Sequence, residues 1–248
     1  MILRRIASAL KRQDWATVLI EFTLVIAGVL VALQVNNWNE ARKDRSLEAA
    51  YLESLHREAM IALPALRDLL EEKEGHLAAL AKVIALMDAG DDEVELTPAQ
   101  CLAIWVSHIY DIGSRDLPTI RELFATGRIS LLGSSELRVA IVEFQQSFSA
   151  RDSRRTNLLG GRIISRDYPH VIKLNPQVFL PPEEGVSHAP TCQLDLMIGD
   201  ESLRNDLIDN GARLYANTNL LIRNELTQLE TIHAYLDEEL RINHGETD

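Results

Sequence analysis

The chain lacks the sequence motifs by which many enzymes are recognised. It has no Cys-x-x-Cys pair, no His-Glu-x-x-His helix, no glycine-rich phosphate loop and no Gly-x-Ser-x-Gly turn. Each of these motifs places reactive or ligating groups at a spacing that the chemistry requires. We therefore expect a protein that is not an enzyme and that uses no cofactor.

Aromatic side chains are scarce, at 5% of 248 residues, whereas Leu, Ala, Glu and Arg are common. These common residues are strong helix formers. No alternation of period two persists long enough to indicate a sheet. The composition therefore predicts an all-α protein.

Basic side chains are scarce after residue 45. Residues 1–45 hold seven Lys/Arg and four Asp/Glu, whereas the remaining residues hold 18 basic and 33 acidic side chains. An acidic body repels the phosphates of nucleic acids, so we expect no nucleic-acid partner. The basic N-terminal end suits an anionic lipid surface.

One long apolar run is present, WATVLIEFTLVIAGVLVALQV at residues 15–35, and Glu21 is its single charge. As a helix it would be about 31 Å long, which is enough to cross the hydrocarbon core of a bilayer. Trp15 and Trp38 lie near its ends, where indole rings prefer the headgroup layer. A cleavable signal peptide is disfavoured because no A-x-A pattern follows, and a buried core helix because such helices rarely stay apolar on every face. We therefore predict a transmembrane anchor at residues 15–38.

The flanking segments predict the orientation of this anchor. Residues 1–14 form a basic amphipathic tail with four Lys/Arg, and translocation of these cations would be unfavourable. We expect the tail in the cytoplasm. The acidic residues 39–248 would then form an all-helical extramembrane domain on the opposite side.

Helical periodicity extends through most of this domain. Apolar residues repeat at steps of three and four within residues 52–87, where Pro64 is an expected kink and Gly75 an expected break. Thr97, and Ser134 or Ser135, are expected N-caps, and residues 174–193 an extended surface loop. A final amphipathic helix covers residues 202–243, with a weak point at Gly211. These segments predict an antiparallel helical bundle in which the first and last long helices pack together.

The stretch EFTLVIAGVLVALQVNNWNE at residues 21–40 resembles the signature of an uncharacterised bacterial family, known as a domain of unknown function. A second stretch, LFATGRISLLGSSELRVAIVEF at residues 123–144, is similar to a looser block of the same family. The resemblance covers much of the chain, but nothing after about residue 165. It implies a single-pass, membrane-anchored helical protein of a bacterium. It implies no activity. With the orientation predicted above, we expect this protein in the inner membrane with its C-terminal domain in the periplasm.

Glu21, Gly28, Ala32 and Asn36 fall within about 80° of one another on a helical wheel. Small residues one turn apart allow close helix approach, and the two polar residues can supply hydrogen bonds between helices. We interpret these four residues as a packing stripe for self-association or for another membrane protein. The alternatives are a glutamate that reaches the inner headgroups, and a proton or ion relay.

Two Glu-x-x-His pairs, Glu53 with His56 and Glu230 with His233, have the ligand spacing of di-iron bundles. Such sites also need carboxylates from two further helices in a set order, and the two motifs here are arranged differently. Chance coincidences are expected in a helical chain rich in Glu. We therefore predict no metal site and interpret the four residues as solvated helix faces.

Arg151, Arg155, Arg162 and Arg166 would share one face of an unbroken helix and could contact an anion. Gly160-Gly161 argues against an unbroken helix, so ion pairs with acidic helices of the same bundle are the preferred interpretation.

Cys101 and Cys192 are the two cysteines. Two separate buried thiols are the preferred interpretation, and a disulfide in an oxidising compartment is the alternative.

Together these features predict a membrane-anchored interaction or accessory module. Its expected partners are the lipid bilayer and either a second copy or another membrane protein. An envelope sensor or small-ligand-binding module that acts through a partner is the alternative function. A bundle-type metalloenzyme is a third interpretation.

Overall fold

The computed structural model describes residues 15–110, 117–158, 160–176 and 189–242, with side chains for all of these except 15–18 and 148–158. Helices make up 77% of the structure. The one sheet of the described residues consists of the two-residue strands β1 (Ile172–Lys173) and β2 (Thr191–Cys192), paired antiparallel. The all-α prediction is therefore confirmed. The chain divides into two compact units, Met1–Tyr51 and Leu52–Asp248.

The first helix, α2, runs from Trp15 to Ala89, and its first part lies in the N-terminal unit. Every side chain from residue 19 to residue 46 is exposed. This part of α2 is long and apolar enough to cross a membrane, because its most apolar 18-residue window has a mean hydropathy of 2.0 and none of that window is buried. Apolar side chains exposed on all faces of a helix are typical of a segment that lipid covers.

In the second unit, α2 continues as the first long helix of a bundle. Its predicted apolar positions are buried at three and four residue steps: Leu52, Leu55, Ala59, Leu63, Leu66, Leu70, Leu80 and Met87. The predicted break at Gly75 is wrong, because α2 continues to Ala89. A helical glycine costs only about 1 kcal/mol relative to alanine, and buried positions on both sides of Gly75 offset this cost. Gly90, with φ of 69°, follows the last residue of α2.

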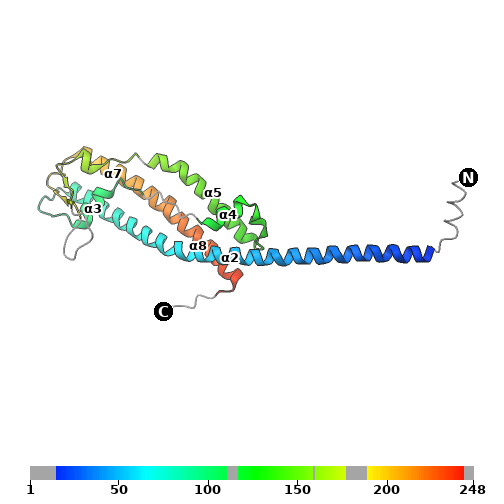
Figure 1. The fold of residues 1–248 in the computed structure, drawn as a ribbon. Coiled ribbons are helices and arrows are strands. Elements are labelled where there is room, and N and C mark those ends of the chain that lie inside the picture. Colours follow the sequence, from blue (N-terminus) through cyan, green and yellow to red (C-terminus); the bar gives the residue numbers. More distant parts are fainter. Residues whose placement is uncertain (1–14, 111–116, 159, 177–188, 243–248) are drawn as a thin grey trace, which may run out of the picture. The chain divides into compact units, whose positions relative to one another are not determined.

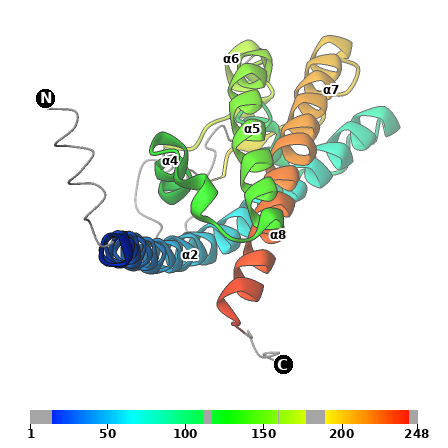
Figure 2. The same cartoon turned by 90° about the vertical axis from the view of Figure 1, so that its right-hand side faces the viewer.

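The last third of the second unit forms a second long helical rod. It consists of α7 (Glu201–Ala216), the π-helical turn η3 (Asn217–Ile222) and α8 (Arg223–Leu240). Arg204 Nη2 donates to Asp88 Oδ2 at 2.9 Å, and Arg67 Nη2 donates to Glu230 Oε1 at 2.8 Å. Since residue numbers rise along α2 as they fall along this rod, the two run antiparallel, as Figures 1 and 2 show. The predicted pairing of the first and last long helices is confirmed.

Gly211 does not weaken this rod, contrary to the expectation. It lies inside α7, and a Cβ atom at this position would approach Leu80 Cδ2 to 3.3 Å. The glycine therefore lets α7 pack closely against α2. The irregularity lies further on, at η3, where Thr218 Oγ1 donates to the Leu214 carbonyl at 2.8 Å.

Further helices complete the bundle, and side-chain caps explain where α3 and α5 begin. Thr97 caps α3 (Pro98–Val106) through a capping box with Gln100. Ser134 Oγ accepts from Leu137 N at 3.2 Å at the start of α5 (Ser135–Leu158), so both predicted caps are confirmed. The remaining elements are α4 (Pro118–Ala125), the 3-10 turn η1 (Arg128–Leu131) and α6 (Ile164–Asp167). In Figures 1 and 2, α5 lies alongside α8.

A compact apolar core joins α2, α3, α6, the two strands and α7 at one end of the bundle. Its residues include Val83, Ile104, Ile164, Met197 and Leu203, all buried. The predicted surface loop at residues 174–193 lies mostly outside the described residues. β1 ends directly before it, whereas β2 (Thr191–Cys192) lies within its last residues, so the predicted end of the loop is wrong.

A disulfide joins Cys101 on α3 to Cys192 on β2, with their Cα atoms 5.6 Å apart. This separation is normal for a disulfide. The expectation of two separate thiols is therefore wrong. The cysteines are 91 residues apart in sequence, so only the packing of the strands beside α3 brings them together.

Candidate functional site

A cluster of two histidines and one aspartate lies between α2 and α8. His56 Nε2 is 3.0 Å from Asp237 Oδ1, and His233 Nδ1 is 3.1 Å from Asp237 Oδ2. The imidazole rings stack with their centroids 5.0 Å apart and their planes 23° apart. Two imidazoles therefore converge on the two oxygens of one carboxylate. We call these three residues the His–Asp cluster.

The helices position this cluster in a simple way. His233 and Asp237 are one turn apart on α8, so their side chains lie on the same face of that helix. His56 comes from the antiparallel α2, 181 residues away in sequence. The side chains are 15%, 14% and 21% exposed for His56, His233 and Asp237, so the cluster is half-buried and accessible to water or an ion.

A sulfur atom lies at the outer side of this cluster. His233 Nε2 is 3.2 Å from Met60 Sδ, whereas the other ring nitrogen, Nδ1, faces Asp237. Met60 lies one turn after His56 on α2, so both helices contribute two residues. A thioether sulfur is a weak hydrogen-bond acceptor, and this contact fixes the orientation of the imidazole ring.

The structure brings together the two histidines of the Glu-x-x-His pairs but not their glutamates. Glu53 is exposed, and Glu230 accepts a hydrogen bond from Arg67. The third member of the cluster is Asp237, which belongs to neither Glu-x-x-His pair. The spacing His233-x-x-x-Asp237 on a helix could have indicated it, because residues four apart share a face.

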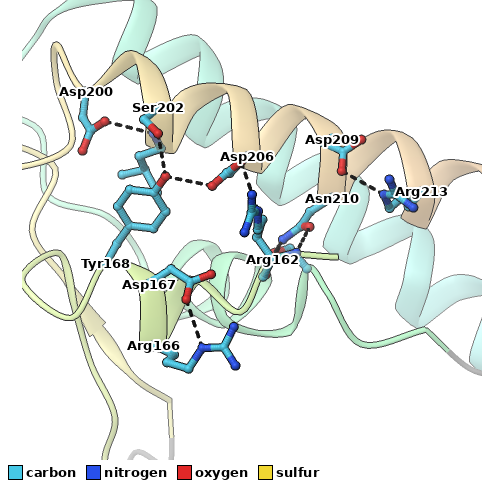
Figure 3. A network of polar contacts seen from close by, with 12 residues as sticks. Arg162, Arg166, Asp167, Tyr168, Asp200, Ser202, Asp206, Asp209, Asn210 and Arg213 are labelled. Atoms are coloured by element: carbon cyan, nitrogen blue, oxygen red, sulfur yellow. Dashed lines mark hydrogen bonds and ion pairs between the residues drawn. The ribbon is translucent and has the colours of Figure 1, made fainter. Parts of the chain in front are cut away.

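The four arginines do not lie on one unbroken helix, because α5 ends at Leu158, next to the Gly160-Gly161 pair that argued against such a helix. Arg151 and Arg155 lie on α5, outside the described side chains, whereas Arg162 follows the helix and Arg166 lies on α6. Arg162 Nε is 3.8 Å from Asp206 Oδ1, and Arg166 Nε donates to Asp167 Oδ1 at 3.0 Å (Figure 3). Both described arginines therefore contact acids of the same domain.

Around Arg162 the structure holds a polar network that the sequence did not indicate (Figure 3). The buried Asn210 of α7 accepts from Arg162 N through Oδ1 at 2.8 Å, and its Nδ2 donates to the Arg162 carbonyl at 2.8 Å. Nδ2 also donates to Ser107 Oγ at 2.9 Å. This amide attaches the segment before α6 and the end of α3 to α7, which is a structural role.

A tyrosine continues the network along α7. Tyr168 Oη donates to Asp206 Oδ2 at 2.8 Å and lies 3.0 Å from Ser202 Oγ (Figure 3). Burial, followed by the hydrogen bond to Asp206, raises the pKa of Tyr168 above its usual value, and the contact with Ser202 opposes this rise only in part. The hydroxyl therefore stays protonated and acts as a hydrogen-bond donor, not as a base.

The packing stripe of the predicted anchor lies on the exposed part of α2. Glu21, Gly28 and Ala32 are exposed, and a Cβ atom at Gly28 would meet nothing within 4 Å. Asn36 Nδ2 donates to Glu40 Oε1 at 3.0 Å along the same helix. Of the predicted interface anchors, Trp38 is exposed, and the side chain of Trp15 lies outside the described ones. The stripe stays a prediction.

Comparison with known proteins places the chain in a family without assigning an activity. Neither the curated proteins nor the solved structures contain a match to this chain. Residues 21–160 match a family of unknown function (DUF6090), and this range includes His56 but neither His233 nor Asp237. The matched range covers more than half of the chain, so the protein belongs to this family of unknown function.

Proposed function

We propose that this protein is a single-pass inner-membrane protein of a bacterium whose helical domain serves as a non-enzymatic interaction or accessory module in the periplasm. The observation that carries the proposal is the exposed apolar part of α2, with a mean hydropathy of 2.0 in a window of which nothing is buried. A soluble protein would expose an unusually large apolar surface there, and a lipid bilayer removes that surface from water.

The disulfide supports the orientation of the domain. Disulfides form and persist in oxidising compartments such as the periplasm and are rare in the cytosol. The pair Cys101–Cys192 lies in the unit that follows the anchor. The four Lys/Arg of residues 1–14 favour a cytoplasmic N-terminus for the same chain.

The buried centre of the bundle favours an interaction module over the sensor that binds a small ligand. Large apolar side chains there, such as Phe144, Ile104 and Met197, are fully buried. A ligand-binding module would instead converge polar groups on an internal cavity. After residue 45 the chain holds 33 acidic and 18 basic side chains, so a partner with basic groups would be complementary in charge.

A C-terminal fusion to a reporter that is active only after export tests the orientation. We expect activity from this fusion and none from a reporter that works only in the cytoplasm, because the basic tail holds the N-terminus inside. The same cells should yield a chain whose mobility on a gel changes on reduction, and Cys101→Ser should abolish this change. A cytoplasmic reporter that is active at the C-terminus would contradict the proposed orientation.

Two charge variants sharpen this experiment. Neutralising the basic residues of the tail should lower the fraction of exported reporter, because these cations oppose translocation: Arg4, Arg5, Lys11 and Arg12. Neutralising the basic residues after the anchor is the matched control and should leave export intact: Arg42, Lys43 and Arg45. Recovery of the unfused chain in the soluble fraction after cell lysis would reject the membrane anchor itself.

A further inference from the structure

We propose that the His–Asp cluster is a binding site for a divalent transition-metal ion, with Zn²⁺ as the expected ion. The bound ion would link α2 to α8. The ligands are His56 Nε2, His233 Nδ1 and the carboxylate of Asp237. Three candidate ligand atoms from these residues lie within 4.8 Å of one another. The cluster lies wholly in the unit Leu52–Asp248, so the inference does not depend on the membrane anchor.

The distances in the cluster are close to those that a bound ion would require. Zn²⁺ binds imidazole nitrogen and carboxylate oxygen at about 2.0–2.2 Å, so two such ligands of a tetrahedral ion lie about 3.3 Å apart. The observed separations are 3.0 Å for His56 to Asp237 and 3.1 Å for His233 to Asp237. Small rotations of the side chains would therefore admit the ion without movement of either helix.

The donor set selects the class of metal. Imidazole suits zinc, copper, nickel and iron, whereas Mg²⁺ and Ca²⁺ prefer sites built from oxygen ligands. Two imidazoles and one carboxylate supply three protein ligands, which leaves a fourth position of a tetrahedral ion for water. The half-buried state of the cluster, with 14–21% of each side chain exposed, gives an ion and this water access.

The surroundings of His233 also fit a metal ligand. A ligating histidine uses one ring nitrogen for the metal and holds its other ring N–H with an outer partner. If Nδ1 of His233 binds the ion, Nε2 carries the proton and donates it to Met60 Sδ, 3.2 Å away. Met60 therefore orients the ring, and it need not bind the ion.

The binding of Zn²⁺ and Co²⁺ to the full chain in detergent tests the site. The chain is first stripped with a chelator and then loaded with Zn²⁺ or Co²⁺. We expect one bound ion per chain by elemental analysis. The Co²⁺-loaded chain should show the visible absorption of Co²⁺ bound to nitrogen and oxygen ligands. An excess of Mg²⁺ should not displace Co²⁺. Asp237→Asn should weaken binding by about 100-fold, because a ligand contributes more than the outer partners, whose loss costs 10–100-fold.

Matched variants separate this site from the Glu-x-x-His motifs. Glu230→Gln removes the ion pair between the same two helices, and Glu53→Gln removes the other motif glutamate, so both should bind within about twofold of wild type. Far-UV circular dichroism checks the fold of each variant. If Asp237→Asn loses helical content, His56→Gln, on the other helix, provides the second test and should show the same loss of binding.

Three results would overturn the inference. The first is less than one tightly bound ion per wild-type chain at saturating Zn²⁺ and Co²⁺. The second is unchanged binding in folded Asp237→Asn or His56→Gln. The third is an equal loss of binding in Glu230→Gln, which would mean that the pairing of the helices, and not the His–Asp cluster, controls the ion.

Discussion

Among single residues, the buried amide of Asn210 connects three segments of the bundle, and Gly161 lets one of these segments pack closely against it. Asn210 makes hydrogen bonds to both backbone groups of Arg162 and to Ser107. The preceding Gly161 is tightly enclosed, because a Cβ atom there would lie 2.5 Å from the Tyr110 hydroxyl and 3.1 Å from Asn210 Oδ1. Burial raises the pKa of Tyr110 to about 12, so this hydroxyl stays neutral beside the glycine.

Asn210→Ala should therefore lower the free energy of unfolding by about 2–4 kcal/mol, because it removes the three hydrogen bonds of a buried amide that connect α7 to Arg162 and Ser107. Chemical denaturation followed by circular dichroism measures the change. Asn205→Ala is the matched control on the same helix, since Asn205 is exposed, and it should change the free energy of unfolding by less than about 0.5 kcal/mol. Equal effects of the two substitutions would contradict the role assigned to Asn210.

At the scale of the element, α2 carries two different surfaces on one helix. Its residues 19–46 are exposed on all sides, whereas its residues 52–87 bury one stripe of leucine and alanine against the bundle. A single helix therefore belongs to both units. The exposed part includes the packing stripe, where Gly28 has open space around it.

We expect Glu21→Gln combined with Gly28→Leu to weaken self-association of the full chain in detergent by about fivefold or more. The leucine prevents close approach of two helices, and the glutamine weakens the polar contact, together about 1 kcal/mol. Sedimentation over a range of detergent concentrations measures the association. Ala27→Leu, about 120° away from Glu21 on the helical wheel, is the control and should have no effect. A monomeric wild-type chain, or unchanged association of the double variant, would reject self-association through the stripe.

At the scale of the whole molecule, two half-buried histidines make stability depend on pH. Burial is the largest cause that lowers the pKa of His76 and of His108 below the ordinary value of 6.5, and Lys73 adds to it at His76. A lowered pKa in the folded state means that the unfolded chain binds more protons. These two histidines therefore cost no stability above about pH 6.5, and they lower the free energy of unfolding as the pH falls below that value.

Between about pH 7.5 and about pH 5.5, the melting temperature of the double variant His76→Gln/His108→Gln should decrease less than that of wild type. The reason is that glutamine has no proton to gain in the unfolded state. Thermal unfolding at the two values measures the difference. His170→Gln is the control, because His170 is exposed, and its pH dependence should follow wild type. A double variant with the pH dependence of wild type would contradict the assignment.

The local features of this protein can be predicted from short stretches of its sequence. The spacing of Leu55, Ala59 and Leu66 predicted the buried stripe of α2, because burial on a helix follows its period of 3.6 residues. The caps Thr97 and Ser134 followed from hydrogen bonds over three residues. The apolar run at residues 15–35 also needs no distant residue to be recognised. Each of these signals is complete within a few turns of chain.

Contacts between residues that are distant in the sequence depend on tertiary packing and could not be predicted. Packing joined Cys101 to Cys192, placed Asn210 against Arg162, and selected Asp237 instead of Glu230 as the partner of His56. The same packing keeps the helices continuous at the glycines that were expected to interrupt them. At Gly211 the side chain of Leu80 packs close to the glycine. The physical reason is that these contacts depend on the register between antiparallel helices. The register is set by the summed burial of many apolar side chains and not by any one short motif.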